Sequence, residues 1–421
     1  MTAPDERLPH PPMFAAFPFS LGLRLLSGGD VRATPAQLAA FRRFAQVGDP
    51  LADDLVAAMR ELPSGEGRRL FELALERGID VVADAPEAMC AFFAQADEVP
   101  YWLDRDQLEL AARVTGRAGL WGMIVALPNL ALMGGYLASR PDKTLVATGD
   151  LDRMAPRRVT ETANWWVDVT SPGGLGRYAP GFAGVLRVRL MHAYVRDAMN
   201  QRADWDHDEW DHPVNQVQLA GTLMLFSLAN LAGCQAMGLR FSGRERAAVF
   251  HLWRYVGWLL GIDPELLPVT ETDTWRLLWL EAATEFRPDP DSRRLAQALA
   301  GAIGPLLVPG DGALSRTASR ALTTYLTSYS RLILGRENAD FLGLPDSKPF
   351  QAAVLATAAV NRTLEYARAV LPGSTRLSET LGHRGRTALI KRIMHEQRGD
   401  GSYARHDALR TRPLTNLTRA S

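Results

Sequence analysis

The fold is decided by residues 184–200, which read GVLRVRLMHAYVRDAMN. Four apolar residues of this stretch stand three or four positions apart: Val185, Val188, Val195 and Met199. His192 falls on the same spacing, whereas Arg187, Arg189 and Arg196 lie off it. Residues at this spacing share one face of a helix. The pattern therefore predicts a helix whose apolar face, with His192 in its middle, points into a core.

The same helical periodicity extends outward on both sides, while alternating strand patterns are scarce. Helices are expected at 35–47, 51–61, 66–78, 86–95, 212–236, 243–261, 270–284, 291–306, 314–334, 349–370 and 379–396. Asp104 is the expected N-cap of a further helix that begins at Arg105. Glycines and prolines break the pattern at 170–184, TSPGGLGRYAPGFAG. The sequence predicts an all-α protein.

The domain organisation expected from these patterns is simple. Residues 1–34 are read as an irregular N-terminal segment, residues 35–396 as one large helical domain, and residues 397–421 as a loose polar tail. The balance of 47 basic and 47 acidic residues gives no electrostatic reason to expect nucleic acid as a partner. Two cysteines, Cys90 and Cys234, cannot form a disulfide framework and suggest a reducing compartment.

The localisation predicted from the sequence is cytoplasmic. The N-terminus reads MTAPDERLPHPP and lacks a basic region followed by an apolar run. Residues 118–138, AGLWGMIVALPNLALMGGYLA, are long enough to cross a bilayer. They contain Pro128, Asn129 and four glycines, and no second such segment is apparent. We therefore expect a buried helix pair and no integral membrane span.

Metal-binding patterns are few. His192 has no ligand partner nearby in the sequence, and His251 is a rival with a similar apolar setting. A core histidine bonded to the backbone is the alternative for either one. Residues 205–212, WDHDEWDH, resemble a calcium loop or the magnesium-binding acids of terpene synthases, but the turn glycine and a second magnesium motif are missing. A solvated helix-capping loop is the simpler interpretation. The Glu-x-x-His pairs of a di-iron bundle are absent.

Residues 148–226 resemble the catalytic core of the latex-clearing proteins, or rubber oxygenases, whose wider superfamily includes an oxygenase of mycophenolic acid biosynthesis. The resemblance rests on a set of short motifs: TG-x-L from Thr148, R-x-x-x-T from Arg158, the PGG loop from Pro172, VRLMHAYVR from Val188 and P-V-N-Q from Pro213. Each motif is weak alone, but the set is specific. A compatible helical pattern continues from about 100 to 370.

The resemblance implies a globin-like helical core, about 100–262, that holds haem b with His192 as the proximal iron ligand. It places Arg158 and Thr162 above the haem, and Asp142 where the family has a glutamate proposed as the catalytic base. Some relatives close the sixth iron position with a lysine, where this chain has Glu161. We therefore expect that position to be open, with Lys143 as the nearest alternative amine.

The function that these features imply is a haem-dependent oxygenase. It would use dioxygen to cleave or oxidise an alkene in a small apolar substrate, isoprenoid-like or polyketide-derived. Structural alternatives remain for each site residue: Arg158 at a helix surface, Thr162 bonded to a carbonyl four residues back, and Asp142 as a helix cap. The functional alternatives are a non-catalytic haem or dioxygen carrier and a magnesium-dependent, terpene-synthase-like enzyme.

Overall fold

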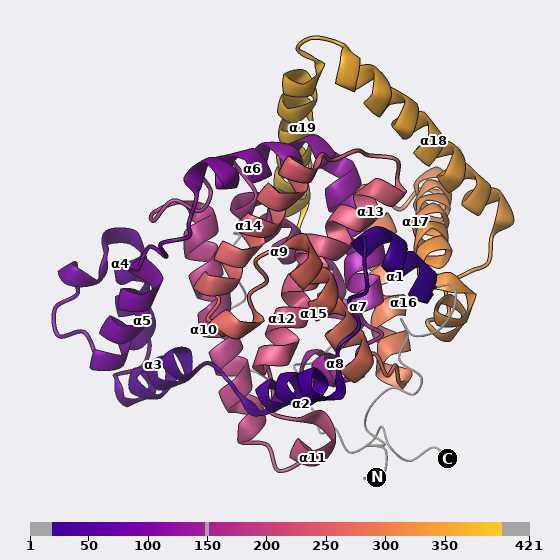
Figure 1. The fold of residues 1–421 in the computed structure, drawn as a ribbon. Coiled ribbons are helices and arrows are strands. Elements are labelled where there is room, and N and C mark those ends of the chain that lie inside the picture. The colour runs from indigo at the N-terminus through magenta and orange to yellow at the C-terminus, as the bar shows by residue number, and fades with distance from the viewer. Residues whose placement is uncertain (1–18, 148–150, 398–421) are drawn as a thin grey trace.

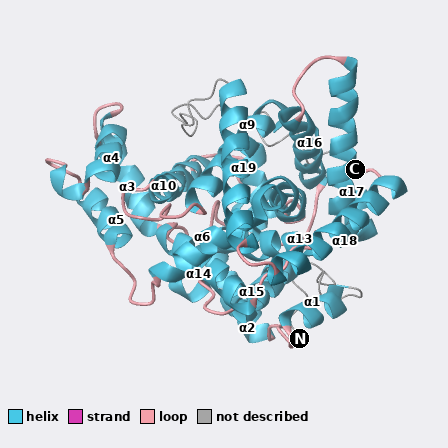
Figure 2. Cartoon of the chain, turned by 90° about the horizontal axis from the view of Figure 1, so that it is seen from above, coloured by secondary structure: helices cyan, strands magenta, loops and turns pink. Residues whose placement is uncertain are grey.

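The computed structural model describes residues 19–147 and 151–397, and in these ranges every regular element is a helix (Figures 1 and 2). The all-α prediction is confirmed. Helix α1 (Phe19–Ser27) lies inside the segment that was expected to be irregular, so that expectation is wrong for these residues. Residues 1–18, and the predicted tail from 398 onward, lie outside the described ranges.

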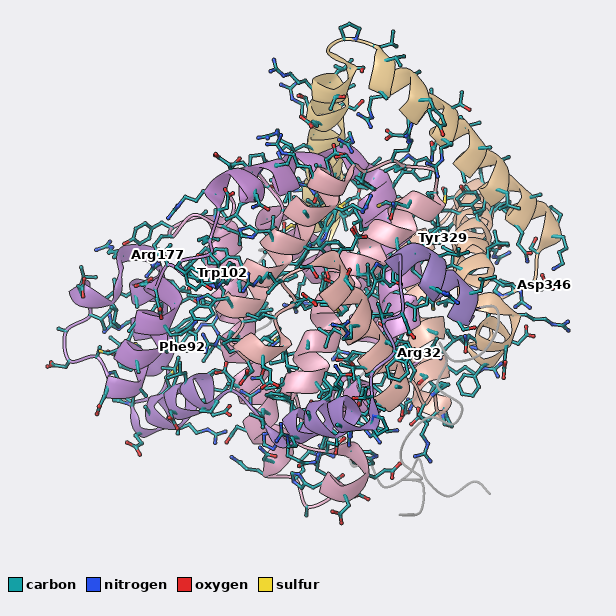
Figure 3. All side chains as sticks on the ribbon, viewed as in Figure 1. Arg32, Phe92, Trp102, Arg177, Tyr329 and Asp346 are labelled. Carbon is teal, nitrogen blue, oxygen red and sulfur yellow. The ribbon has the colours of Figure 1, made fainter. Side chains whose placement is uncertain are left out.

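After α1, helix α2 (Pro35–Arg43) lies at the bottom centre of Figure 1 and continues into η2 (Phe44–Gln46). The next helices form a side lobe, seen at the left of Figure 1: α3 (Pro50–Glu61), α4 (Glu66–Arg77), η3 (Ile79–Val81) and α5 (Glu87–Asp97). Phe71, Phe92 and Phe93 are fully buried between α4 and α5, with ring centroids 5.4–5.9 Å apart. Aromatic burial of this kind stabilises the lobe; Figure 3 labels Phe92.

The central part of the molecule carries the predicted site. Its elements are α6 (Arg105–Leu120), η4 (Trp121–Leu132), α7 (Met133–Gly135), α8 (Ser139–Ala147), α9 (Leu151–Val169), α10 (Pro180–Asn200), α11 (His207–Trp210), α12 (Gln216–Met224), η5 (Leu225–Ala229), α13 (Asn230–Ala236) and α14 (Gly243–Leu259). Asp104 caps α6 as predicted, accepting hydrogen bonds from the backbone N–H groups of Asp106 and Gln107.

The C-terminal helices surround this centre. They are η6 (Pro264–Leu266), α15 (Glu271–Thr284), α16 (Pro290–Leu307), α17 (Ala313–Phe341), α18 (Lys348–Val370) and α19 (Ser374–Glu396). Helix α19 packs closely on α6, where a Cβ on Gly382 would lie 2.3 Å from the carbonyl oxygen of Gly116. Helices α18 and α19 meet in a hairpin that projects at the top of Figure 1.

Most of the apolar segment 118–138 belongs to one long helical run, Arg105–Gly135, in which two helices join at a kink. The run bends at Gly119, whose φ of 52° is outside the helical range, and continues as the π-helix η4. A second helix, Gln216–Ala236, is also long and apolar enough to span a membrane, which corrects the expectation that the first has no companion. Their most apolar windows are 67% and 72% buried, as in core helices.

A tight loop joins α9 to α10 and fixes how these helices meet. A Cβ on Gly174 would lie 2.1 Å from the carbonyl oxygen of Asp168, and one on Gly181 would lie 2.5 Å from that of Gly174. Only glycine allows this approach. The side chain of Arg177, labelled in Figure 3, anchors the loop to Asp97 of α5. The glycines of the predicted irregular stretch thus position the two helices that carry most of the candidate site.

Candidate functional site

His192 lies in the middle of α10 and is half-buried. Its Nδ1 is buried and has no hydrogen-bond partner among the described residues. Burial, followed by the charge of Arg196, lowers the pKa of the imidazole to about 4, so the ring is neutral at physiological pH. A neutral imidazole is the form that binds iron.

His251, the rival ligand, lies on α14 in a different setting. Its Nε2 accepts a hydrogen bond of 2.9 Å from the backbone N–H of Asp104, and its ring meets Trp102 edge-on at 5.7 Å. This nitrogen completes the cap of α6. The core-histidine interpretation therefore suits His251, while His192 retains its metal-binding capacity.

Asp142 lies in α8 and is only 2% exposed. Its Oδ2 accepts a hydrogen bond of 3.2 Å from Ser292 Oγ in α16. Burial, together with the neighbouring carboxylate of Asp289, raises the pKa of Asp142 well above its usual range. The side chain points to α16 from within its own helix, so the helix-cap alternative is wrong.

Arg158 lies on α9 and reaches α8, where its Nη1 donates to the carbonyl oxygen of Leu145 over 3.4 Å. Burial lowers the pKa of its guanidinium, so the surface alternative does not hold. Tyr136, between α7 and α8, is close enough to both groups for their charges to act on it. Burial and Asp142 raise the pKa of Tyr136, and Arg158 lowers it. The structure thus brings Asp142, Arg158 and Tyr136 into one cluster.

Thr162 and Glu161 behave differently on α9. Thr160 donates to the carbonyl oxygen of Pro156 over 2.9 Å, but Thr162 makes no such bond within the described part of the chain. Its hydroxyl is half-buried and available. Glu161 instead forms an ion pair of 2.7 Å with Arg157, which is 49% exposed. Because Glu161 is paired with Arg157, the expectation that it adds a second acid to the candidate site is not supported.

Lys143, the alternative amine ligand, is committed elsewhere. Its Nζ lies 2.5 Å from Asp289 and 2.8 Å from Asp291 at the start of α16. The side chain is 13% exposed. Leaving these two carboxylates for an iron would require breaking a largely buried ion-pair cluster. The expectation of an open sixth position is consistent with the pairing of both Glu161 and Lys143.

Comparison with known proteins identifies the family of this chain. The sequence profile described as the catalytic domain of the ER-bound oxygenase mpaB/B′ and rubber oxygenase matches residues 112–364, which include all four predicted site residues. The chain belongs to this oxygenase family. Among solved structures, a latex clearing protein in the closed state is similar in fold. Its TM-score is 0.61 at 20% identity, with 82% of this chain and 91% of that chain covered. The curated proteins contain no match.

The acidic stretch 205–212 of this oxygenase-family chain has structural roles. Asp206 caps α11, and Asp211 is 1% exposed and pairs with Arg42 at 2.9 Å. The capping interpretation is confirmed for Asp206, whereas Asp211 is buried rather than solvated. Within residues 19–147 and 151–397 no three His, Cys, Asp or Glu side chains gather to hold a metal ion. Because its acids already cap a helix and pair with arginine, the stretch gives the magnesium-dependent alternative no support.

The P-V-N-Q motif is also structural in this member of the family. Asn215 caps α12, and Gln216 donates to the carbonyl oxygens of Gly48 and Gly261 over 2.8 and 3.0 Å. Val214 has a φ of 49°, which is strained for a β-branched residue, and its carbonyl oxygen accepts from Arg196. The motif therefore holds the start of α12 against the loop before α3 and the loop after α14.

Two residues of the interior are not indicated by any sequence pattern. Tyr136 belongs to the apolar segment 118–138, whose composition points only to a membrane span or to buried helices. Glu281 of α15 is 5% exposed, and its Oε1 has no hydrogen-bond partner among the described residues. Its carboxyl lies against α12, where a Cβ on Gly221 would be 2.7 Å from Oε2. Burial and Glu285 raise the pKa of Glu281 well above the usual range. Neither residue stands in a recognisable motif.

Proposed function

We propose that this oxygenase-family protein binds haem b through His192 and uses dioxygen to cleave or oxidise an alkene in a small apolar substrate. The observation that carries the proposal is the state of His192: its imidazole is neutral, and its buried Nδ1 has no hydrogen bond among the described residues. The rival His251 has its Nε2 occupied. A bound haem iron would supply the activation of dioxygen that no amino-acid side chain provides.

The other candidate residues have distinct proposed roles. Arg158, a cation held in a partly buried setting, would stabilise negative charge that develops during the reaction. The hydroxyl of Thr162 would donate a hydrogen bond from the same helix, since it has no partner four residues back. Because the two residues are four positions apart on α9, they share one helical face.

Asp142 is the proposed proton-transfer group. A carboxyl with a raised pKa holds and returns a proton more readily near neutral pH than an ordinary aspartate. Tyr136 lies within the influence of both Asp142 and Arg158 and so links them electrostatically. A carrier that only binds haem has no need for such a cluster, so we favour the enzyme over the carrier.

We also propose a substrate class and a cellular compartment. We propose a small apolar substrate, because the family includes rubber oxygenases and the surroundings of the site are mostly apolar. We propose a cytoplasmic location with no integral membrane span, for which the two free cysteines, Cys90 and Cys234, are supporting evidence.

The test is the haem content of the purified protein and of two matched variants. The wild type should be coloured, with a Soret band. His192→Ala should lose that band and His251→Ala should keep it, while far-ultraviolet circular dichroism shows that both remain helical. A colourless wild type after expression with added haem precursor, or a His192→Ala variant with full haem content, would contradict the proposal.

A further inference from the structure

The tip of the α18–α19 hairpin carries large apolar side chains that no described residue covers. Five of them are at least half exposed: Leu364 61%, Val370 77%, Leu371 59%, Leu377 59% and Leu381 58%. They come from the end of α18, the connecting turn and the first turns of α19, the part of the molecule that projects at the top of Figure 1. Single exposed leucines are common on protein surfaces, but a cluster of this size marks a contact surface.

The rest of α18 continues this apolar surface. Only Val354 and Asn361 are buried in this 23-residue helix. The exposed residues before the tip are nearly all apolar: Ala352, Ala353, Leu355, Ala356, Ala359 and Val360. A helix that faces water normally presents charged residues on its outer side. The outer side of α18 therefore suits an apolar medium better than water.

Arginines flank the tip. Arg362, Arg376 and Arg384 are exposed, and none of them forms an ion pair with another described residue. The acids nearby are already used or partly covered: Glu365 pairs with Arg368 at 2.9 Å, and Glu379 is half-buried. The unpaired charge around the tip is therefore positive.

We propose that the hairpin tip docks on an anionic membrane surface, with its five apolar side chains entering the lipid interface and the three arginines meeting lipid phosphates. Exposed apolar residues beside unpaired cations are the chemistry that binds such a surface. Charge decides against a second copy of the chain, because two such tips placed together would bring like charges into contact. Apolar molecules concentrate in bilayers, so this docking would bring the proposed enzyme to its substrate, although the surface itself does not depend on that function.

The test is co-sedimentation of the full-length protein with vesicles. One set consists of phosphatidylcholine alone, and in the other roughly a third of the lipid is phosphatidylglycerol. The wild type should bind the anionic vesicles more tightly. The double variant Leu371→Glu/Leu377→Glu should bind at least about tenfold more weakly, because it removes apolar burial and adds negative charge. Replacing Arg362, Arg376 and Arg384 by Gln should weaken binding roughly fivefold for each arginine.

The matched control is Val81→Glu. Val81 is also exposed, at 54%, but it belongs to η3 of the side lobe, and this lobe is far from the hairpin (Figures 1 and 2). It should bind like the wild type. Equal binding by the tip variants and the wild type, or no binding of the wild type to anionic vesicles, would overturn the proposal. So would a doubled mass in light scattering that falls to the monomer value in the tip variant, since a second copy would then be the occupant. The arginine variants keep the test valid if the glutamate variant misfolds.

Discussion

The buried arginines of α10 and the histidine between them differ in how their polar atoms are paired. Arg189 is 2% exposed and donates to Asp49 from Nε and Nη2, and Arg196 donates to Asp53 from Nε. His192 is neutral and its Nδ1 has no partner among the described residues. Buried polar groups in folded proteins are normally paired. The paired arginines hold α10 against α3, and the unpaired histidine marks the place where a further group belongs.

The same contrast extends to the neighbouring helices. Lys143 of α8 is held by two carboxylates, whereas Asp142, next to it in the chain, has a raised pKa and one hydrogen bond from Ser292. Groups with perturbed pKa values are candidates for chemistry, and saturated ion pairs are candidates for structure. Substitutions in the two classes should therefore change different properties of the protein.

Arg189→Ala should produce the largest change. It would leave the buried carboxylate of Asp49 without its cation, which costs about 3–5 kcal/mol in comparable cases. We expect the free energy of unfolding in urea to fall by that amount, while haem content per folded molecule is retained. A loss below about 1 kcal/mol would contradict the structural role assigned to the paired arginines.

Asp142→Asn should affect turnover far more than stability. Asparagine preserves the size of the side chain but cannot accept a proton, so the rate with any accepted substrate should fall about a hundredfold or more. The folded carboxyl has a raised pKa, so its effect in the wild type is to lower stability as pH rises above the ordinary aspartate range. The asparagine side chain does not titrate, and urea titrations of the variant should lack this part of the pH dependence. Unchanged turnover would remove Asp142 from the mechanism.

In the haem-free protein, His192 should cause sensitivity to mild acid. The folded imidazole has a pKa of about 4 against 6.5 when unfolded, so the unfolded state takes up more protons between these values. Stability is therefore complete above the unfolded pKa and is lost as pH falls toward the folded one. We expect about 2 kcal/mol less stability at about pH 5 than at about pH 7.5, and that this component is absent in His192→Gln. An identical pH profile in the variant would mean that His192 is not enclosed.

Glu161→Ala should have the smallest effect. Its ion pair with Arg157 is on an exposed helix side, so its loss should change the unfolding free energy by less than about 0.5 kcal/mol. The spectrum of the reduced protein should also stay the same, because the carboxylate is directed to Arg157. A spectral shift in this variant would show that Glu161 reaches the iron after all.

The local features of the fold follow from the sequence, and the long-range ones do not. Helical spacing predicted α10, the apolar face of His192 and the cap at Asp104, because each depends on residues within one or two turns. The partner of Asp142 could not be predicted, since Ser292 is 150 residues away. Gln216 bonds to loops that are far away in the sequence, so its motif does not reveal its structural role. Glu281 likewise depends on distant neighbours and stands in no motif. Helix α1 was missed because only nine residues carry its pattern.

Chemical rescue of the missing imidazole tests directly whether His192 holds the haem. In His192→Gly, the side chain is replaced by a space into which free imidazole can diffuse. We predict that this variant purifies with little haem, and that haem supplied together with imidazole restores the Soret band, whereas His251→Gly retains its haem without any addition. Haem binding by His192→Gly that is equal with and without imidazole would show that another residue holds the iron.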